Sequence, residues 1–337
     1  MLIINDFFKR TKEAVSNQME YLKVATNGKI ITATRFMGQK GFQKEDRKDN
    51  IFIYPPIIYH IVLWLNMFIC GKSIHIFEEE PQLEKRLLFN LFNKDVYVSM
   101  YREPFKKYAE HLKKYKNLKA VYVEAEFHKK ELIDFGIDKN IIHVTPTPAK
   151  ISRKENTKKF NKKDINLLFA SWNNKEGKPM YERGLVYLLG VLQLNPNMRM
   201  TIILRDHQTK GFLKKVAEME LTDRVKLVDI KEHELEGYFD DADFVVYAVQ
   251  KKITKDIPNS ILDGLSRGKP AIISSVFGLA RYVGKAKAGY VVEPNTEPIK
   301  FNITKKEYEE MSKNAYEFSK KFTRENYVKS IMKYYED

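Results

Sequence analysis

The stretch KDIPNSILDGLSRGKPAIISSVFGLARYVGKAKAG, from Lys255 to Gly289, contains a loop, a short helix and a buried strand in direct succession. Pro258 suits the start of the helix because its missing N–H falls where a helix needs none. Gly268 and Pro270 end the helix after about three turns, and Gly264 permits close approach by a neighbouring segment. A buried stripe of Ile261, Leu262 and Leu265 leaves three polar side chains facing away from the core, those of Asn259, Ser260 and Asp263. The pattern predicts a ligand-binding edge beside the strand AIISS.

Strand-like and helical runs alternate along the whole chain, which is typical of parallel sheets covered on both faces. Strands are expected at residues 2–8, 29–34, 50–54, 73–77, 95–100, 120–125, 141–146, 166–170, 200–204, 224–229, 244–249 and 271–275. Helices are expected at residues 11–23, 57–70, 82–91, 104–114, 127–135, 182–194, 211–220, 233–240 and 258–268, with a helical tract at the C-terminal end. The predicted fold class is therefore α/β.

The length of 337 residues and the hydrophobic content of 43% favour two domains, each with its own core. Residues 151–164 are rich in lysine and lack apolar periodicity, so we expect a basic linker there. The predicted organisation is an N-terminal domain over residues 1–150, a C-terminal domain over 165–304 and a helical tract over 305–337.

The single cysteine, Cys70, excludes an intramolecular disulfide and favours a reducing compartment. The first ten residues, MLIINDFFKR, carry charge and lack a long apolar run, so they predict a first strand and no signal peptide. We therefore expect a cytoplasmic protein. The longest apolar run, Ile57 to Cys70, is shorter than the roughly 20 residues that a bilayer requires and predicts a buried helix.

The formal net charge of +15 implies attraction to anions, whether nucleic acid, a phosphorylated substrate or an anionic membrane surface. No RNA-recognition, KH or zinc-finger signature is present, so nucleic acid is not expected as a partner. The segment from Arg102 to Lys119 places Phe105, Tyr108, Leu112 and Tyr115 at helical spacing among basic residues. Two interpretations are open: a helix resting peripherally on anionic lipid headgroups, or a soluble helix with its aromatic face in the core.

The stretch that begins at Lys255 resembles the C-terminal domain of retaining family 4 glycosyltransferases, whose pattern is Glu-Gly-Phe-Pro-Asn-Ser-x-x-Glu-Ala-x-Ala-x-Gly-x-Pro-Val-Ile-x-Ser. The positions in register are Pro258, Asn259, Ser260, Leu262, Gly268, Lys269, Pro270, Ile272 and Ser274, followed by Gly278, Leu279 and Val283. The resemblance extends over about residues 121–337. It implies the GT-B architecture: two Rossmann-like, doubly wound domains facing across a cleft, with the C-terminal helix returning to the N-terminal domain.

In that family the two acids of a Glu-x7-Glu pattern contact the donor sugar and the donor ribose. By resemblance Asp263 takes the ribose position, with Asn259 and Ser260 beside it. Lys255 stands where the first acid is expected, and a shift of one residue would let Asp256 replace it.

The loop from Ser171 to Gly184 follows a predicted strand and precedes a predicted helix. By resemblance Arg183 and Gly184 match a Lys-Gly pair at the helix start, where the cation binds the donor phosphates. Lys175 or Lys178 could supply a second cation. The resemblance implies no metal and no cofactor beyond the nucleoside diphosphate sugar.

The predicted strand KSIHIFEEEP ends in acids, and related enzymes have a comparable strand end next to the reacting sugar. Glu79 or Glu80 could position an acceptor hydroxyl or act as a general base. His75 alternates with isoleucines, which favours a hydrogen-bonded structural histidine over a catalytic one.

Three functions remain open, of which the third is an epimerase or phosphorylase on the same fold. The first is transfer of a sugar from a nucleoside diphosphate sugar to a hydroxyl of a glycan or lipid-linked acceptor, with retention of configuration. The second is a catalytically silent, glycosyltransferase-like binding or scaffold protein, favoured by Lys255 at an acidic position.

Overall fold

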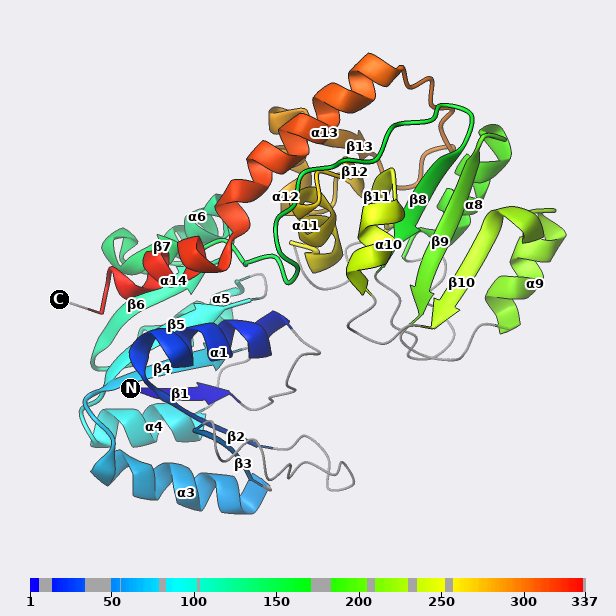
Figure 1. Ribbon diagram of the computed structural model, residues 1–337. Coiled ribbons are helices and arrows are strands. Elements are labelled where there is room, and N and C mark those ends of the chain that lie inside the picture. Colours follow the sequence, from blue (N-terminus) through cyan, green and yellow to red (C-terminus); the bar gives the residue numbers. More distant parts are fainter. Residues whose placement is uncertain are drawn as a thin grey trace. The chain divides into compact units, whose positions relative to one another are not determined.

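The computed structural model describes residues 1–5, 14–33, 50–54, 56–78, 83–101, 104–170, 183–204, 210–229, 235–251 and 257–335. The chain forms two compact units (Figure 1). Unit 1 is Met1–Pro148 with Arg324–Asp337, and unit 2 is Ala149–Thr323.

Unit 1 contains a parallel sheet whose described strands are in the order β3-β2-β1-β4-β5-β6-β7. These strands are β1 (Leu2–Asn5), β2 (Lys29–Ala33), β3 (Ile51–Tyr54), β4 (Ser73–Glu78), β5 (Asp95–Met100), β6 (Leu118–Val123) and β7 (Ile142–Val144). The order reverses beside β1, which is the mark of a doubly wound sheet. Each of them falls within two residues of its predicted range or inside it.

Helices cover both faces of this sheet. They are α1 (Ala14–Thr26), α3 (Pro56–Ile69), α4 (Leu83–Leu91), α5 (Lys106–Leu112), α6 (Glu126–Asp134), the 3-10 turn η1 (Lys139–Ile141) and α14 (Arg324–Met332). Ile4 points into a core with residues of α3, α4, α5 and α6, while its neighbour Ile3 points into a second core with residues of α1 and α14. The alternation along β1 thus separates two helical layers.

Helix α14 confirms the expected return of the C-terminal helix to the N-terminal domain. The Tyr122 hydroxyl donates to the carbonyl of Ile331 at 3.2 Å, and the Tyr327 hydroxyl donates to Gln18 Oε1 at 3.4 Å. The predicted tract over 305–337 is interrupted, because helix α13 (Lys305–Ser319) and the 3-10 turn η4 (Lys320–Phe322) end before Thr323, which adopts an extended conformation.

His75 has the structural role that its alternating position favoured. Its side chain is fully buried, Nε2 lies 2.7 Å from Ser99 Oγ, and Nδ1 contacts the Tyr335 hydroxyl. Its ring stacks on that of Tyr122 with centroids 5.5 Å apart. Burial lowers the pKa of His75 from 6.5 to about 3, so the ring is neutral in the folded protein.

Helices α5 and α3 of unit 1 differ in how far their apolar side chains are buried. In α5 and the residues beside it, Tyr108, Leu112 and Tyr115 are buried, which agrees with the soluble interpretation for three of the four predicted positions, whereas Phe105 is 40% exposed. The run from Ile57 to Cys70 does form a helix, α3, but the prediction that this helix is buried is wrong for one of its faces. Phe68 is 61% exposed and Ile69 is 77% exposed, because the helix is apolar all round while the sheet covers one side.

Unit 2 contains a second parallel sheet, whose described strands are in the order β10-β9-β8-β11-β12-β13. The strands are β8 (Ile165–Phe169), β9 (Met198–Leu204), β10 (Val225–Asp229), β11 (Phe244–Tyr247), β12 (Ala271–Ser274) and β13 (Gly289–Val292). The connecting helices and turns are α8 (Leu185–Leu194), α9 (Lys210–Glu218), η2 (Thr222–Arg224), α10 (Leu235–Asp241), α11 (Asn259–Ser266) and α12 (Gly278–Ala286), followed by α13 and η4. Helix α12 and strand β13 were not among the elements predicted from the sequence.

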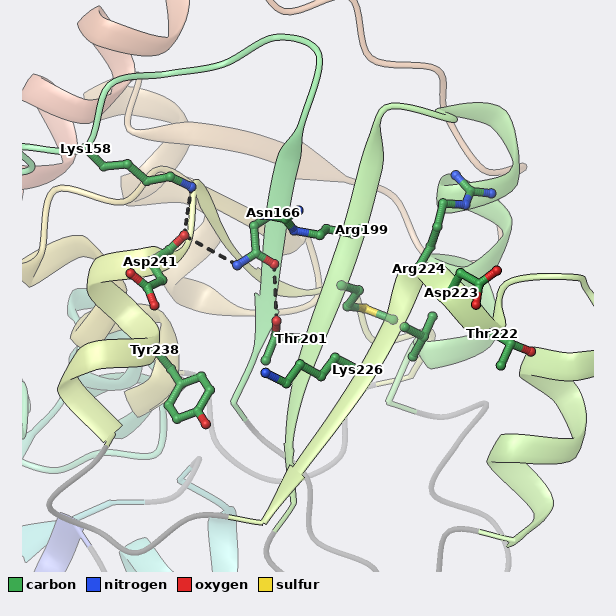
Figure 2. A pocket seen from close by; sticks show the side chains of 12 residues that line it. Lys158, Asn166, Arg199, Thr201, Thr222, Asp223, Arg224, Lys226, Tyr238 and Asp241 are labelled. Carbon is green, nitrogen blue, oxygen red and sulfur yellow. Dashed lines mark hydrogen bonds between the residues drawn. The ribbon is translucent and has the colours of Figure 1, made fainter.

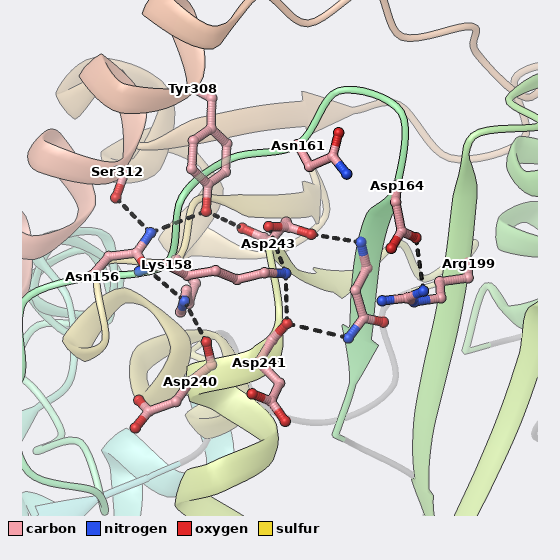
Figure 3. Close-up of polar contacts among 12 residues, drawn as sticks. Asn156, Lys158, Asn161, Asp164, Arg199, Asp240, Asp241, Asp243, Tyr308 and Ser312 are labelled. Atoms are coloured by element: carbon pink, nitrogen blue, oxygen red, sulfur yellow. Dashed lines mark hydrogen bonds and ion pairs between the residues drawn. The ribbon is translucent and has the colours of Figure 1, made fainter.

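The basic segment 151–164 has no regular secondary structure and is anchored within unit 2 (Figure 3). Lys158 Nζ lies 2.8 Å from Asp243 Oδ1 and donates to the carbonyl of Asp241 at 2.7 Å. Asp243 is fully buried, and its Oδ2 accepts from the Asn166 N–H of β8 at 2.7 Å. These aspartates therefore fix the segment to the start of the sheet.

A buried lysine completes this attachment. Lys269 Nζ donates to Asn156 Oδ1 at 2.7 Å and to the carbonyl of Asp240 at 2.8 Å, and the residue is 1% exposed. Burial, the largest influence, lowers the pKa of Lys269 from 10.5 to about 8. The described elements of both units confirm the α/β class, with two Rossmann-like parallel-sheet domains.

Candidate functional site

The strand order of unit 2 identifies one edge of its sheet as the place for a ligand. The order changes direction between β8 and β11, which are hydrogen-bonded neighbours. In doubly wound sheets, ligands bind outside the carboxyl ends of the strands at such a switch point. The segments that follow β8 and β11 in the sequence are therefore the candidates for ligand contact.

Gly184 sets the position of helix α8 at this edge. It is the residue before the helix and has a left-handed backbone with φ +78°. A Cβ atom at this position would lie 1.7 Å from the carbonyl oxygen of Ala248, just after β11. Only glycine permits this contact, which holds the N-terminus of α8 against the chain that leaves β11.

Arg183 lies beside this contact. Its Nη1 donates to the Tyr247 hydroxyl at 3.3 Å, and Tyr247 is the last residue of β11. The Tyr247 ring packs on Phe277 and Phe169, with centroids 5.0 Å and 5.7 Å away. The guanidinium is therefore held at the carboxyl ends of β8 and β11, next to the positive end of the α8 dipole.

Helix α11 contributes a second N-terminus. Pro258 precedes its first residue with an extended backbone, and no side chain caps the helix. Asn259 and Ser260 form its first turn and are half-buried. Ser260 Oγ is buried without a hydrogen-bond partner among the described residues, so it has donor and acceptor capacity for a ligand. Gly264 provides the predicted close approach, because a Cβ there would lie 2.3 Å from a methyl group of Val245.

Asp263 differs from its sequence-based expectation. It was predicted to face away from the core, but it is only 5% exposed. Its Oδ1 accepts from the backbone N–H of Lys150 at 2.7 Å and of Ile151 at 3.3 Å. The reason is that the segment after residue 149 runs over this side of α11 and needs an acceptor for its amides. Ribose binding by Asp263 stays a prediction.

The other predicted site residues lie outside the described part of the chain. They are Glu79, Glu80, Lys175, Lys178, Lys255 and Asp256. The structure thus brings together Arg183 and Gly184 at α8, and Asn259 and Ser260 at α11. Tyr247, which holds Arg183, was not singled out from the sequence. Its position as a polar residue at the end of an apolar strand is the signal that could have found it.

A separate cavity of about 670 Å³ lies at the opposite edge of the unit 2 sheet (Figure 2). The residues that line it include the second residue of each of β8, β9 and β10, namely Asn166, Arg199 and Lys226. Two of its cations already have partners, since Arg199 pairs with Asp164 at 2.8 Å and Lys158 pairs with Asp243. The cavity lies at the amino ends of the strands, so it is distinct from the switch-point site.

Comparison with known proteins agrees with this architecture. The fold is GT-B, with two Rossmann-like α/β domains. Residues 176–324 match the family model described as "Glycosyl transferases group 1". No curated protein gives a significant match to the chain.

Several solved structures share the fold over nearly the whole chain. A glycosyltransferase from Rickettsia africae has a TM-score of 0.73 at 15% identity, covering 99% of this chain and 98% of its own. HepE of Anabaena, solved with UDP-glucose, has a TM-score of 0.70 at 11% identity, with 99% and 98% covered. WaaG, a glycosyltransferase involved in lipopolysaccharide biosynthesis, has a TM-score of 0.60 at 9% identity, again with 99% and 98% covered. At these identities the likeness concerns the fold.

Proposed function

We propose that the protein is a glycosyltransferase that moves a sugar from a nucleoside diphosphate sugar to a hydroxyl of a glycan or lipid-linked acceptor, with retention of configuration. The observation that carries the proposal is the placement of Arg183 and Gly184 at the switch point of unit 2. Both residues fall inside the range 176–324 that matches the group 1 family model. The complexes of HepE with UDP and with UDP-glucose support a nucleoside diphosphate donor.

In this proposal the donor diphosphate binds between the N-termini of α8 and α11. Arg183 supplies a cation, and the first amides of α8 point toward the phosphates. Lys175 or Lys178 adds a second cation, and Ser260 Oγ gains a partner that it lacks among the described residues. The proposal uses no metal and no cofactor besides the donor, because these cations and dipoles stabilise the departing diphosphate.

The reaction breaks the bond between the anomeric carbon and the diphosphate oxygen, while the acceptor hydroxyl oxygen bonds to the same carbon. Glu79 or Glu80 accepts the hydroxyl proton or positions the acceptor. Lys255 and Asp256 precede α11 and are assigned to the donor sugar. Asp263 is primarily a positioning residue, because its carboxylate holds the chain at Lys150 and Ile151.

The alternative is a binding protein on the same fold without transfer activity, which Lys255 at the expected acidic position favours. Thermal unfolding of the full chain with UDP, GDP and ADP and with their sugar conjugates distinguishes the two. An enzyme is expected to gain stability with one nucleotide selectively and to release that nucleotide from its sugar conjugate. Selective stabilisation without release supports the silent binding protein, and no stabilisation by any donor contradicts the donor site.

Arg183→Ala tests the site directly. Hydrogen bonds to charged groups contribute about 1.5 to 3 kcal/mol, so donor affinity is expected to fall about 10- to 150-fold. Arg199→Ala is the matched control, since Arg199 is at the other edge of the sheet and pairs with Asp164 on the surface. Equal donor affinity in the two variants would remove Arg183 from the site.

A further inference from the structure

Helices α3 and α4 of unit 1 present a broad apolar surface to solvent. We call it the α3–α4 surface, and its members are 47% to 77% exposed: Ile58, Ile61, Trp64, Leu65, Phe68, Ile69, Leu83, Leu87 and Leu91. Most of the exposed large apolar side chains of the described residues are on these two helices. Soluble monomers rarely expose a contiguous apolar area of this kind, so the surface is a candidate site for interaction with a protein or a membrane.

The exposed residues follow helical periodicity. In α3 they recur at Ile61, Trp64, Leu65, Phe68 and Ile69, which is one continuous face of a helix. The opposite face of α3 packs into the core of unit 1 through buried Tyr59, Leu63 and Met67. The helix therefore has two apolar faces, and the sheet accounts for only one of them.

The two helices lie side by side, so their outward faces form one surface (Figure 1). The Phe68 ring of α3 meets the Phe92 ring just after α4, with centroids 4.7 Å apart. Lys85 Nζ of α4 lies 5.9 Å from the centre of the Tyr59 ring. Helix α3 contains no charged side chain along its 14 residues.

Cations border this surface. Asn90 of α4 donates to the carbonyl of Lys114 at 2.8 Å and accepts from the backbone N–H of Lys116 at 2.8 Å. Both lysines are exposed, and among the described residues neither forms an ion pair. Asn90 is three residues from Leu87 and one from Leu91, so the two lysines are anchored next to the apolar stripe of α4.

We propose that the α3–α4 surface docks on an anionic lipid bilayer, with its apolar side chains in the headgroup and acyl boundary and the lysines on the phosphates. Apolar faces with flanking cations are the chemistry of interfacial helices. Among the described residues, no helix is long and apolar enough to cross a membrane. A second copy of the chain is a poorer partner, because a two-fold interface would bring the two sets of lysines together.

Docking itself does not depend on sugar transfer. If the proposed function holds, docking further implies that the acceptor is lipid-linked and is approached from the bilayer surface. That step rests on the proposed function, whereas vesicle binding is measured without donor or acceptor. Failure of vesicle binding is therefore distinguishable from failure of the proposed sugar transfer.

The test is cosedimentation of the full chain with vesicles of phosphatidylcholine containing about one-third phosphatidylglycerol. Trp64→Ser with Phe68→Ser is expected to weaken binding at least about tenfold, because two interfacial anchors are lost. Lys114→Glu with Lys116→Glu is expected to weaken binding and to reduce its dependence on salt. The matched control is Leu194→Ser with Leu213→Ser, which removes two apolar side chains of unit 2 with 45% and 47% exposure.

Three results would overturn the proposal: no binding of the wild-type chain, equal weakening in the control, or a wild-type dimer that the α3 variant dissociates. Trp64 gives an independent signal, because it is one of two tryptophans in the chain. In a Trp172→Phe background, its fluorescence is expected to shift to the blue on vesicles and to be quenched by brominated lipid. Unchanged emission on bound vesicles would place another surface at the membrane.

Discussion

Replacement of Gly184 by alanine tests the geometry on which the candidate site depends. The left-handed backbone at φ +78° costs an alanine about 1 to 2 kcal/mol. The added Cβ would also lie 1.7 Å from the Ala248 carbonyl oxygen and 2.3 Å from its carbon. Relief of such an overlap requires a backbone shift, which adds about 1 to 3 kcal/mol. Gly184→Ala is therefore expected to lower the free energy of unfolding by about 2 to 5 kcal/mol.

The assay is urea denaturation followed by far-ultraviolet circular dichroism, with hydrogen exchange to locate the change. Because two units can unfold separately, the loss is assigned to unit 2 only if amides of α8 and β11 lose protection. Gly237→Ala is the control, since a Cβ on Gly237 in α10 meets nothing within 4 Å. Alanine in an open helical position is neutral or stabilising. A Gly184→Ala protein as stable as wild type would refute the contact between α8 and the end of β11.

Three further predictions concern buried polar groups. Asp263→Ala leaves the amides of Lys150 and Ile151 without their acceptor, so the ligand-free protein is expected to lose about 2 to 4 kcal/mol of stability in denaturation; unchanged stability would contradict the positioning role. Folding lowers the pKa of Lys269 from 10.5 to about 8, so between these pH values the unfolded chain binds more protons than the folded chain. The free energy of unfolding of wild type, relative to that of Lys269→Met, is therefore expected to rise by about 3 kcal/mol as the pH increases across this range. Folding lowers the pKa of His75 from 6.5 to about 3, so the free energy of unfolding of wild type is expected to fall by as much as about 5 kcal/mol relative to His75→Phe as the pH decreases across that range. A difference between the two proteins that does not change with pH would mean that His75 is solvated.

Much of the fold could be predicted because hydrophobic periodicity is a local property. The strand at residues 95–100 was predicted with its observed bounds, and the strand order needs only short right-handed connections once the strands are known. Helix boundaries were less accurate. Helix α5 was expected at residues 104–114 and spans Lys106–Leu112, because the backbone before it is extended up to Phe105.

Properties set by distant segments could not be predicted. Asp263 looked like an exposed helical carboxylate, and its burial depends on amides more than a hundred residues earlier in the chain. Lys269 likewise has partners at Asn156 and Asp240 that no local pattern reveals. For α3, the apolar composition was evident, but the sequence alone did not indicate that the sheet covers only one of its faces.

Helix α14 has a consequence for how the protein is made. This helix covers one face of the unit 1 sheet, where Tyr327 and Ile331 share a core with Ile3, Met19 and residues of β5 and β6. On the ribosome, every described strand of that sheet and all of unit 2 are synthesised before α14. Unit 1 therefore cannot complete this core until α14 is synthesised, and part of an apolar face stays available to chaperones up to that point.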